Sequence, residues 1–138
     1  MKRSELKRLA ELRRQDALSL LQQRRYGACY YLAGYAVECA LKACIAKQFN
    51  ANTIPDPKRV NSIYTHQVEV LVGIAGLKTA LDTEAARDPD FEANWNVVKD
   101  WKPERRYQLG VTRTEAQGLY NAIDDPHHGV FQWLQRNW

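Results

Sequence analysis

Two polar clusters in this sequence contain residue types that could do chemistry. Glu38 and Lys42 stand four residues apart in an otherwise apolar stretch, and Arg105, Arg106 and Tyr107 follow one another much later. A carboxylate in an apolar setting must be paired or protonated, because an isolated buried charge is too costly. An arginine of the later run could therefore fold back to neutralise Glu38 and fasten its own loop. Alternatively, Lys42 and the two arginines line an anion-binding groove, in which Tyr107 stacks on a base.

A third polar group lies near the end of the chain, where Asp125 and Pro126 precede His127, His128 and Gly129. Aspartate before proline is typical of a helix start, since the carboxylate caps the helix and proline suits its first position. Capping explains these two residues without catalysis, whereas the two imidazoles remain candidates for acid–base chemistry. Adjacent residues on a helix point about 100° apart, so the histidine pair does not favour a metal site.

The motifs that usually mark cofactors and activated nucleophiles are absent from the sequence. It has no glycine-rich phosphate loop, no GxSxG turn, no CxxC pair and no HExxH helix. We therefore predict neither a cofactor nor a metal. The three cysteines, Cys29, Cys39 and Cys44, are an odd number within one segment, which argues against disulfides and favours small buried hydrophobic residues.

Length and composition are those of an ordinary globular protein. The chain has 138 residues, 45% hydrophobic and 26% charged, with a formal net charge of +4, which predicts one domain spanning residues 1–138. No apolar run reaches the roughly 18 residues of a membrane span and no apolar targeting segment begins the chain, so we expect a cytoplasmic protein. Residues 1–25 hold eight basic and three acidic side chains. This basic segment is either a solvated helix face or a field that attracts phosphates.

The element that must position these groups is the segment 26–48, which is apolar on almost every side. Such a helix can only lie among other helices, and its many alanines let neighbouring backbones approach closely. Tyr31, Tyr35, Glu38 and Lys42 are spaced to form one polar-tipped stripe along it. The sequence therefore predicts a buried central helix with a single anomalous acid, Glu38.

Helices are also expected before and after this segment. The apolar spacing predicts a first helix over about 4–24 with Ser4 as N-cap, and a break before the central helix. Pro55 and Pro57 predict a long loop after the central helix. A third helix is expected from an N-cap at Thr65 to about residue 86, bending or dividing near Gly76.

Three further helical segments complete the pattern. Asp88 and Pro89 predict a helix start, and Pro103 predicts that this helix ends near Trp101. Thr112 with Glu115 forms a capping-box pattern that opens the next helix. A last helical stretch is expected after Asp125–Pro126, ending at residue 138. No alternating pattern indicates a strand, so the fold class is all-α: an antiparallel bundle of four to five helices plus a short C-terminal helix.

Four tryptophans are more than so small a core requires. We expect a homodimer whose interface buries some of them. They are Trp95, Trp101, Trp133 and Trp138.

The order of these segments resembles the HEPN family of prokaryotic all-helical domains. The resemblance spans nearly the whole chain and rests on the central YYLAGYAVECALKACIAK, the THQVEVL start and the WNVVKDWKPERRY segment. It implies a helical bundle that forms a homodimer with a groove at the dimer interface. It also implies a role linked to RNA, because many HEPN proteins are metal-independent endoribonucleases of toxin–antitoxin or phage-defence systems. Others partner a minimal nucleotidyltransferase.

The family's ribonuclease motif places a histidine four to six residues beyond an arginine and a polar residue. Arg105, Arg106 and Arg113 have no histidine at that distance, so the motif is not intact. We therefore expect an RNA- or nucleotide-binding module that uses Lys42 and the loop bearing Arg105, Arg106 and Tyr107.

Two alternatives stay open. In the first, the protein is an endoribonuclease, in which His127 or His128 acts as general base toward a ribose 2′-hydroxyl and Arg105 or Arg106 stabilises the phosphorane. In the second, it is a non-catalytic interaction dimer that partners a nucleotidyltransferase.

Overall fold

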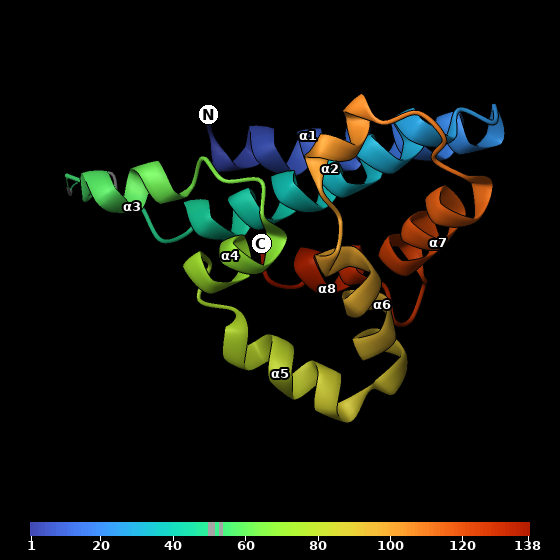
Figure 1. The fold of residues 1–138 in the computed structure, drawn as a ribbon. Coiled ribbons are helices and arrows are strands. Elements are labelled where there is room, and N and C mark those ends of the chain that lie inside the picture. Colours follow the sequence, from blue (N-terminus) through green and yellow to red (C-terminus); the bar gives the residue numbers. More distant parts are fainter. Residues whose placement is uncertain (50–51, 53) are drawn as a thin grey trace.

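The computed structural model describes residues 1–49, 52 and 54–138, and every regular element among them is a helix. The first two helices run side by side across the molecule (Figure 1). Some of the later elements also pack against the second helix. The elements are α1 (Arg3–Gln22), α2 (Tyr26–Ala46), α3 (Pro57–Ser62), α4 (Val68–Ile74), α5 (Lys78–Arg87), α6 (Pro89–Lys99), the 3₁₀ helix η1 (Pro103–Tyr107), α7 (Arg113–Asp124) and α8 (Val130–Gln135).

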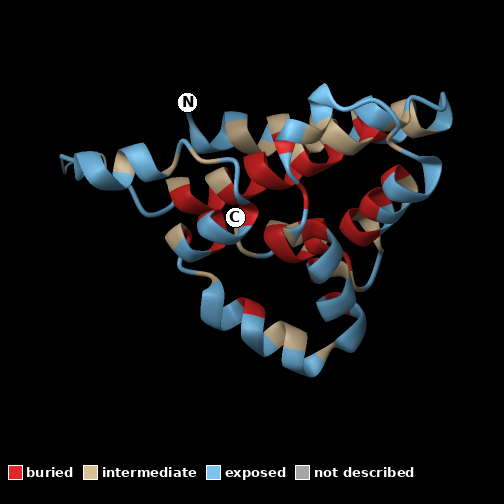
Figure 2. Cartoon of the chain, viewed as in Figure 1, coloured by how far each residue is buried: buried red, intermediate tan, exposed pale blue. Residues whose placement is uncertain are grey.

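Helix α2 lies at the centre of the fold, as its apolar sequence predicts. It packs against α1, α4, α7, α8 and η1. Most of its residues are buried, whereas α3 and α5 are largely exposed (Figure 2). Glu38, 1% exposed, is the one charged residue that is buried in the described part of the chain. The three cysteines are free and buried, and burial raises the pKa of each thiol to about 11. They therefore behave as small core residues.

Two helix starts follow the sequence closely because they depend on neighbouring residues. The Asp88 carboxylate accepts hydrogen bonds from the backbone N–H groups of Asp90 and Phe91, with Pro89 in the first turn of α6. At α7, Thr112 and Glu115 form the expected capping box. Each cap satisfies backbone donors that the first helical turn leaves free.

Other predicted boundaries are wrong for identifiable reasons. The N-cap of α1 is Lys2 rather than Ser4, and the Lys2 backbone donates to the Glu5 carboxylate. Pro57 does not prevent helix but begins α3, since proline suits the first helical position and Asp56 caps it. The rest of that predicted loop includes positions 50, 51 and 53, which lie outside the described residues.

The expected third helix is two helices. As expected for one of the two alternatives, it divides at Gly76, whose φ of +71° favours a residue without a Cβ. The first of the two begins at Val68 rather than after Thr65, whose hydroxyl instead accepts from the Gln67 backbone. The described residues thus form eight α-helices. The sequence predicted four to five helices and a short C-terminal helix.

The start of α8 also differs from expectation. Asp125 and Pro126 form a turn rather than a helix start, because the Asp125 carboxylate accepts from the backbone N–H groups of His127 and His128. Helix α8 begins only after Gly129, with Val130, and ends at Gln135.

The tryptophans belong mainly to the interior of a single chain. Trp95, Trp101 and Trp133 are buried, and Trp138 packs edge-on against Phe131. Their number therefore gives no support to a dimer interface, and the homodimer stays a prediction. None of the described helices has the length and apolar character needed to cross a membrane.

Trp101 occupies the position that matters most for packing. Its indole lies directly over Gly34 of α2, where an added Cβ would overlap the ring. The indole N–H donates to the backbone oxygen of Tyr30 at 3.1 Å. This close approach holds the segment that carries η1 against α2.

Candidate functional site

The buried Glu38 is held by two residues that reach it from different parts of the chain. Lys42, one helical turn further along α2, donates from Nζ to Oε1 at 2.8 Å. His66, which precedes α4, places Nδ1 3.0 Å from each of the two carboxylate oxygens. The side chain of Lys42 is 20% exposed and that of His66 is 54% exposed, so solvent can reach both partners of the buried acid. We call these three residues the Glu38 cluster.

The arginines of η1 do not belong to this cluster, and the expectation that one of them neutralises Glu38 is wrong. Arg105 forms an ion pair with Glu115 of α7 and lies over the ring of Tyr30. Arg106 donates to the backbone oxygen of Pro103 at 3.2 Å. Lys42 already stands at helical spacing from Glu38, so its ammonium reaches the carboxylate without any loop folding back.

Arg106 instead lies between two tyrosine rings. Its guanidinium carbon is 5.5 Å from the ring centre of Tyr31 and 4.6 Å from that of Tyr107, and it donates to the Tyr107 hydroxyl at 3.0 Å. That hydrogen bond raises the pKa of Arg106. Tyr107 is 78% exposed. We call Tyr31, Arg106 and Tyr107, with the neighbouring Tyr30 and Arg105, the arginine–tyrosine surface.

The polar-tipped stripe expected along α2 supplies the base of this surface. Tyr31 stacks on Tyr35 with ring centres 6.1 Å apart and on Trp101 at 6.4 Å. The aromatic rings are therefore fixed by packing before any ligand arrives. The C-terminal end of the stripe, formed by Glu38 and Lys42, belongs to the Glu38 cluster. Lys42 therefore does not lie with the arginines with which it was expected to act.

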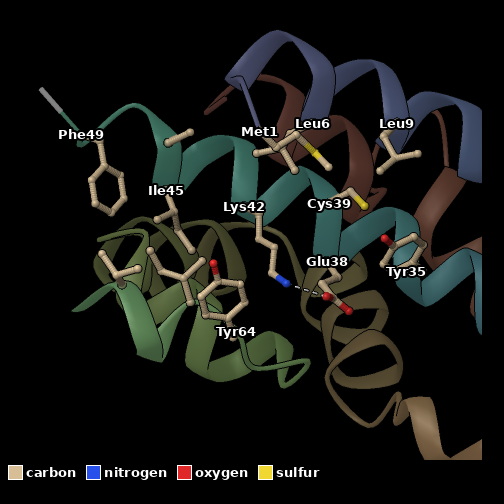
Figure 3. Close-up of a pocket in the computed structure, with 13 residues that line it drawn as sticks. Met1, Leu6, Leu9, Tyr35, Glu38, Cys39, Lys42, Ile45, Phe49 and Tyr64 are labelled. Carbon is tan, nitrogen blue, oxygen red and sulfur yellow. Dashed lines mark hydrogen bonds and ion pairs between the residues drawn. The ribbon is translucent and has the colours of Figure 1, made fainter. Parts of the chain in front are cut away.

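Two pockets flank the Glu38 cluster. The first pocket, about 330 Å³, lies between α1, α2 and residues 60–64, and both Glu38 and Lys42 line it (Figure 3). The second pocket, about 670 Å³, lies between residues 65–70 and residues 99–104, and His66 lines it. The contact between Glu38 and His66 therefore lies between the two pockets.

His127 and His128 lie far from the arginines. The His128 ring contacts the Asp88 carboxylate, with Nδ1 to Oδ2 at 2.6 Å, and this hydrogen bond raises the pKa of His128 and lowers that of Asp88. Arg105 is tied to Glu115 in the first turn of α7, whereas the histidines follow its last residue. Nine residues of helix separate the two places by ~14 Å. Within a single chain, therefore, the histidines and arginines proposed as catalytic do not lie together.

One group of metal-ligand types occurs among the described residues. Oxygen and nitrogen atoms of Asp88, Asp90 and His128 lie within 4.8 Å of one another. The Asp88 carboxylate already caps α6 with one oxygen and contacts His128 with the other. These hydrogen bonds account for the arrangement without an ion.

The basic first helix is only partly a solvated face. Arg14 points inward, where it pairs with Asp124 of α7 and lies over the ring of Phe131. Arg8 is exposed on the outer side. The outer side thus keeps positive charge that could attract phosphates, while Arg14 helps to join α1 to α7.

Sequence reasoning missed His66 as part of the site. It lies 28 residues from Glu38 in the chain, in a connecting segment with no periodicity that would indicate which way its ring points. The only local signal was its place after Thr65 at a predicted helix start. Trp101 and Lys102 border the second pocket as well, whereas the sequence placed Trp101 at a helix end and among the tryptophans of a dimer interface.

No family model, no curated protein and no solved structure matches this chain.

Proposed function

We propose that this chain is an RNA- or nucleotide-binding helical module of the HEPN kind, with the arginine–tyrosine surface as its binding site. The observation that carries the proposal is Arg106, held between the rings of Tyr31 and Tyr107 with no carboxylate partner among the described residues. As in the family it resembles, we expect a homodimer acting in a phage-defence or toxin–antitoxin setting.

The chemistry of this surface suits a single strand. Bases stack on exposed aromatic rings whatever their identity, and Tyr107 offers such a ring. Arg106 presents a guanidinium that hydrogen-bonds phosphate oxygens and remains charged at all working pH values. Arg105 contributes less positive charge, because Glu115 pairs with it. The bases of a duplex are already stacked on one another, so the preference is for unpaired nucleotides.

Replacing Arg106 and Tyr107 together by alanine is expected to weaken binding of a fluorescent single-stranded RNA on the order of 10- to 100-fold, because a stacking ring and a phosphate contact are both lost. Loss of one phosphate contact lowers the slope of log K against log salt by about 0.7. Fluorescence anisotropy at two salt concentrations measures both quantities.

The matched control is Arg59→Ala with Tyr64→Ala, which removes the same residue types from exposed positions in and after α3. It should bind as the unaltered protein does. A third variant, Arg8→Ala, tests the outer face of α1. If Arg8→Ala weakens binding and the Arg106–Tyr107 variant does not, the basic first helix is the binding surface instead. No binding at low salt favours the interaction dimer that partners a nucleotidyltransferase.

A second candidate function is metal-independent RNA cleavage, and the Glu38–His66 contact favours it. Glu38 accepts from Nδ1–H of His66, which leaves Nε2 unprotonated in the neutral ring. The ring lines the second pocket beside Lys99 and Lys102. In this candidate Nε2 takes the proton of a ribose 2′-hydroxyl, whose oxygen attacks phosphorus and expels the 5′-oxygen. Lys102 offers positive charge to the phosphorane, and water protonates the leaving oxygen.

Cleavage by His66 makes a prediction that separates it from cleavage by the C-terminal histidines. With EDTA present, His66→Gln should abolish cleavage of a single-stranded RNA into 2′,3′-cyclic phosphate and 5′-hydroxyl ends, because glutamine cannot act as the base. The double variant His127→Ala, His128→Ala should retain it. The reverse result would mean that the histidines in the turn before α8 carry out the cleavage. If the unaltered protein does not cleave RNA, only the binding function is left.

A further inference from the structure

We propose that the first pocket binds a small monocarboxylate with an apolar body, and that Lys42 receives its carboxylate. This inference is separate from RNA binding, because the pocket lies between α1, α2 and residues 60–64 rather than on the arginine–tyrosine surface. Figure 3 shows the pocket with Leu6 and Leu9 from α1 on one side and Tyr64 on the other. Lys42 points across it toward Glu38.

The pocket is apolar along most of its walls, and its polar groups include the hydroxyls of Tyr35 and Tyr64. Leu6, Leu9, Ile45 and Ile63 supply aliphatic surface, and Glu38 and Lys42 supply the charged groups. Ligand sites in proteins commonly combine an apolar lining with a few fixed polar groups that orient the ligand. The buried Glu38 makes Lys42 such a fixed group, because the ion pair holds the ammonium in one position.

The hydrogen-bond donors and acceptors that line the pocket indicate which kind of ligand group it can bind. An ammonium has three N–H donors, and Lys42 has one hydrogen bond to a described residue, at Glu38. Glu38 accepts from both Lys42 and His66, so both of its carboxylate oxygens already have donors. Two N–H groups of Lys42 are therefore left for water or a ligand. The pocket therefore suits a ligand group that accepts hydrogen bonds rather than one that donates them.

A carboxylate suits these two donors better than a phosphate does. Its two oxygens match two N–H groups, whereas a phosphate carries more charge and more oxygens than one ammonium can satisfy. The other lining side chains add neutral donors, the Tyr35 and Tyr64 hydroxyls, but no second cation to balance a phosphate. A neutral carbonyl would accept the same hydrogen bonds but lacks the charge, so it is expected to bind more weakly.

The size of the pocket limits the apolar body. A volume of about 330 Å³ lies at the lower end of the range of about 300 to 1,000 Å³ found for small-molecule pockets. A ligand of roughly ten heavy atoms therefore fits, and octanoate has this size. Each buried methylene is worth about 0.8 kcal/mol, or roughly a fourfold change in affinity. From butanoate to octanoate the dissociation constant should thus fall by about fourfold for each added methylene. Tetradecanoate should gain little more, because its added carbons lie outside.

Isothermal titration of the full chain with octanoate, butanoate, tetradecanoate and octanamide tests the proposal. We expect octanoate to bind at least tenfold more tightly than octanamide. Equal affinity for the two, or an affinity that does not rise with chain length up to octanoate, would overturn the carboxylate site.

Variants place the binding in this pocket. Val60→Trp fills the pocket from α3 and should abolish octanoate binding, whereas Val97→Trp adds the same ring at an exposed place on α6 and should not. The double variant Glu38→Gln, Lys42→Met keeps the shape and removes both charges. It should bind octanoate and octanamide equally. If Val60→Trp leaves octanoate binding unchanged, the carboxylate binds elsewhere and the inference fails, whatever the RNA experiments give.

Discussion

Replacing Gly34 by alanine is expected to lower the free energy of unfolding by about 3 kcal/mol or more. The added Cβ would overlap the Trp101 indole, which is buried between α2 and η1 and cannot move aside as a surface side chain would. Displacing the ring also breaks its hydrogen bond to the Tyr30 backbone. Chemical denaturation followed by circular dichroism measures the change.

Gly118→Ala is the matched control for this substitution. Gly118 lies within α7 at an exposed position, and a Cβ there meets nothing within 4 Å. Alanine favours helix over glycine, so this variant should gain up to about 1 kcal/mol. If the two glycine substitutions change stability alike, Trp101 does not pack on α2 as described. The arginine–tyrosine surface would then lose its support, because Tyr31 stacks on the same indole.

Lys42→Met is expected to cost about 2 to 3 kcal/mol, because it leaves Glu38 buried with His66 as its remaining partner. Methionine keeps the length and apolar stem of the lysine, so little packing is lost. The double variant Glu38→Gln, Lys42→Met should be more stable than Lys42→Met, since no buried charge is left unpaired. Urea denaturation of the three proteins measures this difference.

A second lysine pair in the chain provides the control. Lys78 and Asp82 have the same spacing on α5 and lie 3.6 Å apart, but both are largely exposed. Exposed pairs of this kind contribute about 0.3 to 0.5 kcal/mol, so Lys78→Met should change stability little. Equal costs for Lys42→Met and Lys78→Met would mean that Glu38 is not buried. The donor count on which the carboxylate site depends would fail with it.

Features that depend on near neighbours were predictable from the sequence. The central position of α2 follows from a long run of apolar and small residues, and the stacking of Tyr31 on Tyr35 follows from their spacing on one face. The caps at Asp88 and Thr112 were equally readable. The pairing of Glu38 with Lys42 was within reach for the same reason, although the arginines were expected to take that place.

Partners distant in the chain were not predictable. A pattern can say that Glu38 must be neutralised but not from which direction, because that depends on how the segment around His66 crosses α2. The sequence left open that the histidines at 127 and 128 act together with the arginines of η1. The length of α7 keeps them apart.

By itself the sequence determined an all-helical chain with α2 at its centre, since helical periodicity and capping are set by residues within one or two turns of each other. Only the tertiary structure decided that His66 completes the Glu38 cluster, that Trp101 closes over Gly34, and that Arg106 lies between Tyr31 and Tyr107. These contacts join segments whose approach depends on the turns between the helices. Such turns are fixed by packing of the whole chain rather than by local preference.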